Sequence, residues 1–137
     1  EEEDSIKELV KELDLGTQVM FFKDIGDDLK NALIAKSNIF VMPSVIHKTS
    51  VEGFGISFIE AASYGKGSIG GLSGGEADAI DNGKTGYLCD GNDLNSIYQN
   101  ILKFFEKDNY RVLGSQAKEF SKKFKWNDIV KKYLKLI

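Results

Sequence analysis

Short, largely apolar segments alternate with stretches of helical periodicity, and this alternation constrains the fold more than any other feature. Four such segments lie at 19–22, 39–42, 68–70 and 87–89. Strands that are apolar along their whole length are buried on both faces, as in a parallel sheet covered by helices. The alternation therefore predicts an α/β fold, with a Rossmann-like parallel sheet and helices on both faces. A chain of 137 residues is long enough for one domain with its own core, so we assign 1–137 to a single domain.

Helical patterns fill the rest of the chain. Residues 5–8 have the form of a capping box, and Gly16 supplies a stop for the helix that follows. Asp27 is the predicted cap of a second helix, a third begins near Gly55, and a helical turn begins near Gly75. The C-terminal third is predicted to be helical, with two apolar stripes that we interpret as core packing. The stripes are Leu94, Ile97, Tyr98, Ile101, Leu102 and Phe105, and Trp126, Ile129, Val130, Tyr133, Leu134 and Ile137.

Composition excludes several classes of partner. A formal net charge of −3 gives no basic footprint for nucleic acid. A single cysteine, Cys89, excludes an internal disulfide and favours a reducing compartment, so we expect a cytoplasmic protein. No apolar run is long enough to span a membrane. The lysine-rich C-terminal stretch is interpreted as a solvated face, with peripheral contact at the inner face of a membrane as the alternative.

The stretch 51–65 carries the candidate site. A glycine turn at 53–55 opens an apolar helix, whose first N–H groups can face an anion. That helix has no polar face, so we expect it to be buried. A second acid, Glu60, lies within it and leans back toward the helix start, where Glu52 precedes the turn. Residue chemistry alone leaves two readings open, a functional pair of acids or acids held by structural partners.

Three further features have weaker signals. The glycine-rich loop 70–75 can form an anion-binding nest or can simply connect sheet and helix closely. His47 lies in an extended loop and is expected to be solvated, with contact to a ligand as the alternative. No His, Asp or Cys cluster has the spacing of metal ligands, so no metal site is predicted.

The two acids and their spacing resemble a known family. Glu52 and Glu60 are separated by seven residues that begin Gly-Phe-Gly. This pattern resembles the retaining glycosyltransferases of the two-Rossmann-domain (GT-B) class, group 1 or family 4-like, which includes mannosyl- and glucosyltransferases and sucrose synthases. Further matches follow in order at 40–44, 74–80, 82–88 and 124–126. The resemblance extends over nearly the whole chain and implies the C-terminal half of a GT-B fold.

The resemblance also implies a role for each matching residue. Glu60 corresponds to the acid that accepts hydrogen bonds from the ribose of the nucleotide. Glu52 corresponds to the acid that holds the hydroxyls of the donor sugar, and it is the candidate catalytic residue. Asp78 stands where the family more often has Glu. The other matching donor-binding positions are Phe54 and Gly55 for the sugar, Ile56 and Ser57 for the diphosphate, and Gly74 and Gly75 in the following loop.

The implied function is transfer of a hexosyl unit from a UDP-, GDP- or ADP-sugar to a glycan or a lipid-linked acceptor, without a cofactor. In this family, a basic pair upstream neutralises the diphosphate, and an N-terminal domain binds the acceptor. Neither has a match here, so we expect the chain to be truncated at its N-terminal side and inactive alone. Two alternatives stay open: a non-catalytic nucleotide-sugar binding module and a sugar-nucleotide epimerase of GT-B architecture.

Overall fold

The structure is a computed structural model that describes residues 2–46 and 52–135. His47 lies outside the described residues. The chain divides into two compact units, Glu1–Lys30 and Asn31–Ile137, which are described separately. The first contains α1 (Glu2–Glu12) and the start of α2 (Asp27–Lys36). The second contains the end of α2, β1 (Ile39–Met42), α3 (Ile56–Ser63), β2 (Gly67–Gly71), α4 (Glu76–Ala79), β3 (Gly86–Cys89), α5 (Leu94–Phe105), the 3₁₀ turn η1 (Glu106–Asp108), α6 (Asn109–Ser121), the 3₁₀ turn η2 (Lys122–Phe124) and α7 (Trp126–Tyr133).

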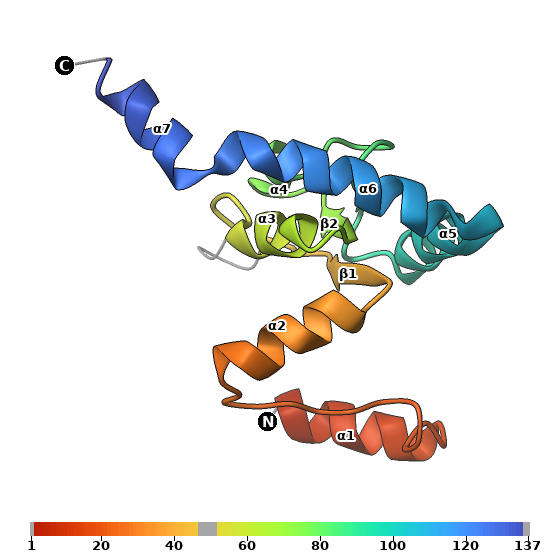
Figure 1. Ribbon diagram of the computed structural model, residues 1–137. Helices are drawn as coiled ribbons and strands as arrows, with labels where there is room; N and C mark the ends of the chain where they lie inside the picture. The colour runs from red at the N-terminus through yellow and green to blue at the C-terminus, as the bar shows by residue number, and fades with distance from the viewer. Residues whose placement is uncertain (1, 47–51, 136–137) are drawn as a thin grey trace. The chain divides into compact units, whose positions relative to one another are not determined.

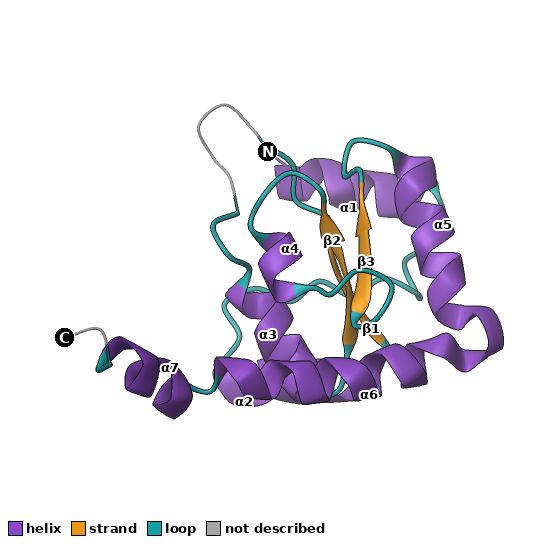
Figure 2. Cartoon of the chain, turned by 90° about the horizontal axis from the view of Figure 1, so that it is seen from above, coloured by secondary structure: helices purple, strands orange, loops and turns teal. Residues whose placement is uncertain are grey.

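The second unit is built on a three-stranded parallel sheet in the order β1-β2-β3. Ile39 pairs with Gly67, and Ser68 pairs with Gly86. Crossovers between parallel strands are right-handed, so a sequential strand order places α3 and α4 on the same face. Figure 2 shows these two helices on one side of the strands and α5 on the other. The predicted α/β class, with a parallel sheet, helices on both faces and a helical C-terminal third, is confirmed.

Alternate residues of the strands pack into two separate cores, one on each face of the sheet. On one face, Ile69 and Cys89 pack with Phe104 of α5 and Leu113 of α6. On the other face, Phe58 of α3 packs with partly buried strand residues and with the segment after α4. Figure 1 shows α6 running beside α3, and η2 connects it to α7. The helix α3 thus packs against both the sheet and α6.

The predicted strand at 19–22 is wrong. The residues 19–22 have no strand conformation in the structure, and the side chain of Met20 is 75% exposed. A strand is stable only when its backbone N–H and C=O groups are paired with a neighbouring strand. Within the first unit, the described residues include no strand that could supply such pairing. Apolar composition alone therefore gave a false signal here.

The helix α1 also differs from its predicted limits. It begins at Glu2, so Ser5 lies inside the helix rather than at its cap. The residue that takes a left-handed conformation after the helix is Asp14, with φ 53°, and not Gly16. A run of acids in the first turn favours the earlier start, because negative charge stabilises a helix N-terminus.

The two C-terminal stripes are only partly buried. In α5, the fully buried side chain is Phe104, with Ile97 and Ile101 packed against the same core. The predicted stripe members that are exposed are Leu94, Tyr98, Leu102 and Phe105. Their face is rotated by about one residue from the face that meets the sheet, a shift of about 100°. In α7, Trp126 is 75% exposed and Leu134 is 64% exposed, whereas Ile129 and Val130 are partly buried. Ile137 lies outside the described residues.

Substitution of Phe104 tests which face of α5 carries the core. Phe104 is fully buried, whereas the adjacent Phe105 is 49% exposed. Phe104→Ala should lower the free energy of unfolding by about 3–5 kcal/mol, because it removes a large side chain and leaves a cavity. The matched variant Phe105→Ala should cost about 1 kcal/mol or less. Urea unfolding followed by circular dichroism measures both, and equal losses would contradict this packing.

Candidate functional site

A tight turn places the first acid directly before the motif helix. The Oε1 atom of Glu52 accepts a hydrogen bond from the amide of Gly55 at 2.8 Å. Gly55 has φ +84°, and a Cβ atom added there would lie 2.5 Å from Cδ2 of Phe58. Only glycine adopts this conformation in this space without strain. The turn thereby fixes the Glu52 side chain at the start of α3.

The first turn of α3 is open to solvent. The amide of Phe58 donates to the carbonyl of Gly55 at 3.0 Å, so Ile56 and Ser57 provide the amides that precede the first helical bond. The expectation of a buried helix is wrong at this end, because Ile56 is 76% exposed. Only one stripe of α3 faces the sheet and α6, and its fully buried members are Phe58, Ala61 and Ala62.

The second acid lies on a groove between α3 and the end of α6. Glu60 is half-buried rather than fully buried. It lines a groove of about 610 Å³ that Glu52 does not border. The structure thus places one acid at the start of the helix and the other on its flank. The other residues that line the groove are Ile56, Ile59, Ser63, Lys118, Ser121, Lys122, Phe124 and Lys125.

The glycine-rich loop after β2 packs against the turn 52–55 that precedes α3. The amide of Gly75 donates to the carbonyl of Glu52 at 2.9 Å. A Cβ atom at Gly75 would overlap the carbonyl of Gly53, so this glycine permits direct contact between two backbones. Asp78 is exposed on α4, and its amide donates to the carbonyl of Gly75 at 3.1 Å. Close backbone contact therefore accounts for Gly75 within the described structure.

Sequence reasoning missed Glu76, the acid directly after the two glycines. Its side chain is fully buried, and its Oε1 atom accepts a hydrogen bond from the amide of Gly71 at 3.2 Å. Its Oε2 atom has no hydrogen-bond partner within the described part of the chain. The available signal was an acid between a glycine-rich loop and the apolar segment at 79–80, where a carboxylate is costly to bury.

Cys89, at the end of β3, lies near this buried acid. Burial raises the pKa of the Cys89 thiol, and the charges of Asp90 and Glu76 raise it further. Its Sγ atom donates to the carbonyl of Gly70 at 3.5 Å. A thiol with a raised pKa is a poor nucleophile, and the buried position of Cys89 agrees with the buried strand predicted at 87–89.

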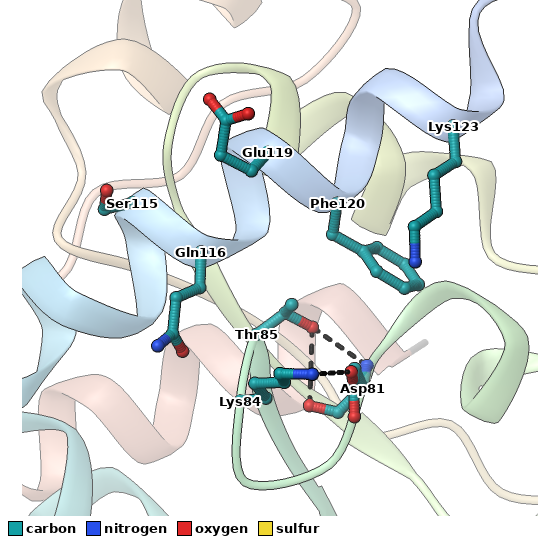
Figure 3. A pocket seen from close by; sticks show the side chains of 8 residues that line it. All are labelled: Asp81, Lys84, Thr85, Ser115, Gln116, Glu119, Phe120 and Lys123. Atoms are coloured by element: carbon teal, nitrogen blue, oxygen red, sulfur yellow. Dashed lines mark hydrogen bonds and ion pairs between the residues drawn. The ribbon is translucent and has the colours of Figure 1, made fainter.

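A second hollow lies between the loop 81–85 and α6. It has a volume of about 330 Å³, and Figure 3 shows Phe120 of α6 and Lys123 of η2 across from Asp81 and Thr85. Thr85 Oγ1 accepts a hydrogen bond from the amide of Asp81 at 2.8 Å. None of the residues implied by the motif lines this hollow. We therefore take the groove beside Glu60 as the candidate site.

Aromatic rings connect the turn 52–55 to the end of α6 and to η2. The ring centroids of Phe54 and Phe124 lie 5.5 Å apart, and those of Phe120 and Phe124 lie 5.4 Å apart.

Among residues 2–46 and 52–135, no three His, Cys, Asp or Glu side chains gather as metal ligands. Within the same residues, no helix is long and apolar enough to cross a bilayer.

Comparison with known proteins identifies the family. The family model described as "Glycosyl transferases group 1" matches residues 1–123. The chain therefore belongs to this family, as the motifs indicated. A GDP-mannose-dependent alpha-(1-6)-phosphatidylinositol monomannoside mannosyltransferase from Mycobacterium tuberculosis is 25% identical over 94% of this chain and 34% of its own length. The chain spans about a third of the length of the first curated relatives that it matches.

Solved structures show the same fold. Sucrose-phosphate synthase from Thermosynechococcus elongatus matches with a TM-score of 0.84 and 28% identity, over 98% of this chain and 33% of that protein. HepE from Anabaena, in complex with UDP-glucose, matches with a TM-score of 0.77 and 22% identity, over 99% of this chain and 38% of that protein. The described fold is thus the Rossmann-like C-terminal half of the GT-B architecture.

Substitution of the two glycines of the turn tests its geometry. Gly55→Ala should lower the free energy of unfolding by about 1–3 kcal/mol, because alanine is strained at positive φ and its methyl group would meet Phe58. Gly53→Ala is the matched control, since a Cβ atom there meets nothing within 4 Å. Thermal unfolding measures both variants. A Gly55→Ala protein as stable as Gly53→Ala would contradict the described turn.

Proposed function

We propose that this chain is the donor-binding domain of a retaining hexosyltransferase. The donor is a nucleoside-diphosphate sugar with a UDP, GDP or ADP group, and the acceptor is a glycan or a lipid-linked acceptor bound by another domain. The observation that carries this proposal is the bond from the Gly55 amide to the Glu52 carboxylate, directly before an exposed helix start. It lies within the span that matches the family.

The start of α3 provides the charge that a diphosphate requires. The amides of Ile56 and Ser57 lie in the first helical turn, where N–H groups and the helix dipole favour an anion. As the glycosidic bond breaks, negative charge grows on the departing diphosphate. Fixed N–H groups stabilise that charge without reorganisation, which lowers the barrier. In this proposal the helix start carries the charge with no metal and no cofactor.

The two acids act on different parts of the donor. Glu60 is half-buried on the groove beside α6, where its carboxylate can accept hydrogen bonds from the ribose hydroxyls. Glu52 is oriented by the Gly55 amide and holds the hydroxyls of the sugar, with Phe54 and Gly55 as backbone contacts. The acceptor then attacks from the face of the leaving group, which retains the configuration. Gly74 and Gly75 of the glycine-rich loop and Asp78 of α4 complete the donor site beside the sugar.

The relatives support a nucleotide-sugar donor of unspecified base. A protein of the same fold has been solved with UDP-glucose, and a curated relative is described as GDP-mannose-dependent. The two differ in both base and sugar. The site residues named here contact the ribose, the diphosphate and the sugar, which are the parts that such donors share.

Steady-state kinetics of the full-length natural protein separate the two acids. Glu60→Gln should mainly raise KM for the donor, because the ribose contact is present before and during transfer. Loss of a charged hydrogen bond of about 1.5–3 kcal/mol predicts a decrease in kcat/KM of roughly ten- to a hundredfold. Glu52→Gln should mainly lower kcat, because the sugar gains positive charge in the transition state.

Glu106→Gln, at an exposed acid in η1, is the control for these two variants. It should leave both parameters unchanged. If Glu52→Gln leaves kcat intact while Glu60→Gln abolishes it, the two roles are reversed. If neither folded variant differs from the control, the acids do not form the site.

A further inference from the structure

A fully buried carboxylate closes the glycine-rich loop from within. Glu76 begins α4, and its Oε1 atom accepts from the amide of Gly71, the last residue of β2. This bond joins the two ends of the loop 71–75 at the C-terminal edge of the sheet. Ligands of open parallel sheets bind at that edge.

Hydrogen bonds connect this loop to the turn 52–55 that precedes α3. The amide of Gly75 donates to the carbonyl of Glu52, and the side chain of Glu52 accepts from Gly55. A Cβ atom at Gly74 would lie 2.6 Å from Oε2 of Glu76 and 3.0 Å from the carbonyl oxygen of Glu52. The Glu76 carboxylate and the Glu52 backbone therefore both lie close to Gly74, where a side chain would have no room.

Burial of a carboxylate at this position costs free energy that an apolar side chain would not cost. A buried acid needs hydrogen-bond partners, and only one oxygen of Glu76 has one among the described residues. A Cβ atom added at Gly70 would lie 2.6 Å from Cδ1 of Ile80 and 3.2 Å from Cβ of Glu76, so both side chains pack on Gly70. The specific contribution of the carboxylate is the bond to Gly71, which sets the conformation of the loop.

We propose that Glu76 is a positioning residue for Glu52. It closes the loop 71–75, and the closed loop holds the Glu52 backbone so that its carboxylate meets the donor sugar. This inference rests on the proposed function for its effect on transfer, but the effect on the loop can be measured separately. Small displacements of a reacting group cost much rate, so the consequence should be seen in kcat.

Amide hydrogen exchange of the full-length natural protein tests the link to the loop directly. Glu76→Ala removes the acceptor of Gly71, so the amides of Gly71 and Gly75 should exchange about tenfold faster or more, while the amides of α6 stay protected. Glu76→Gln keeps an oxygen at the position of Oε1, so both glycine amides should stay as protected as in the wild type. Circular dichroism establishes that each variant is folded.

Donor kinetics of the same variants test the consequence for transfer. Glu76→Ala should lower kcat about 10- to 100-fold, with KM for the donor changed by less than about threefold. Glu76→Gln should have a kcat close to that of the wild type. The exposed acid Glu106, changed to Ala, is the matched control and should leave both values unchanged. A residue that contributed only to stability would not produce a selective loss of kcat.

The outcomes separate this inference from the proposed function. Unchanged exchange of Gly75 in a folded Glu76→Ala protein overturns the inference, as does a Glu76→Gln protein that loses as much kcat as Glu76→Ala. If Glu76→Ala does not fold, the Glu76→Gln protein alone tests the inference. Faster exchange of its Gly71 amide than in the wild type would show that the Oε1 atom does not hold that amide, and would overturn the inference. A wild-type protein that transfers no sugar overturns the proposed function. The amide exchange of the Glu76 variants then still decides whether Glu76 holds the loop.

Discussion

The hydrogen bond between the Gly55 amide and the Glu52 carboxylate is the constraint on which the rest of the site depends. It needs a left-handed residue at Gly55, and that residue must lack a side chain because Phe58 occupies the adjacent space. The same turn starts α3 and leaves its first amides exposed. One local geometry thus sets the position of an acid and the direction of a helix end, both at the edge of a parallel sheet.

The surrounding fold supplies rigidity to this turn. Phe58 anchors α3 in the core on one face of the sheet, and its ring meets that of Phe40 edge to face at 5.5 Å. On the other side of the turn, the amide of Gly75 fixes the carbonyl of Glu52. The site is therefore held by backbone contacts that only glycines permit, and by a packed aromatic pair. Rigid placement of this kind is what electrostatic stabilisation of a transition state requires.

Sequence patterns predicted the elements whose periodicity is matched by burial, and they failed where a partner decided the outcome. The strands 39–42 and 87–89 were predictable because their apolar residues pack alternately into the cores on the two faces of the sheet, with Val41 as an exposed exception. The segment 19–22 has a similar apolar composition, but the described residues of its unit include no neighbouring strand, and it adopts no strand conformation. Glu52 and Glu60 were found from their spacing, whereas the exposure of Ile56 depends on which stripe of α3 meets the sheet. The position of Glu76 between a glycine-rich loop and an apolar segment was the available signal, but its full burial depends on the path of that loop and not on a local pattern.

The most direct test of this account is a crystal structure of the full-length natural protein with a nucleoside diphosphate bound. UDP, GDP and ADP are the ligands to use, since the base is open. The account predicts phosphate oxygens within hydrogen-bond distance of the amides of Ile56 and Ser57, and ribose hydroxyls on the carboxylate of Glu60. A nucleotide bound instead in the hollow between the loop 81–85 and α6, with the start of α3 unoccupied, would contradict it.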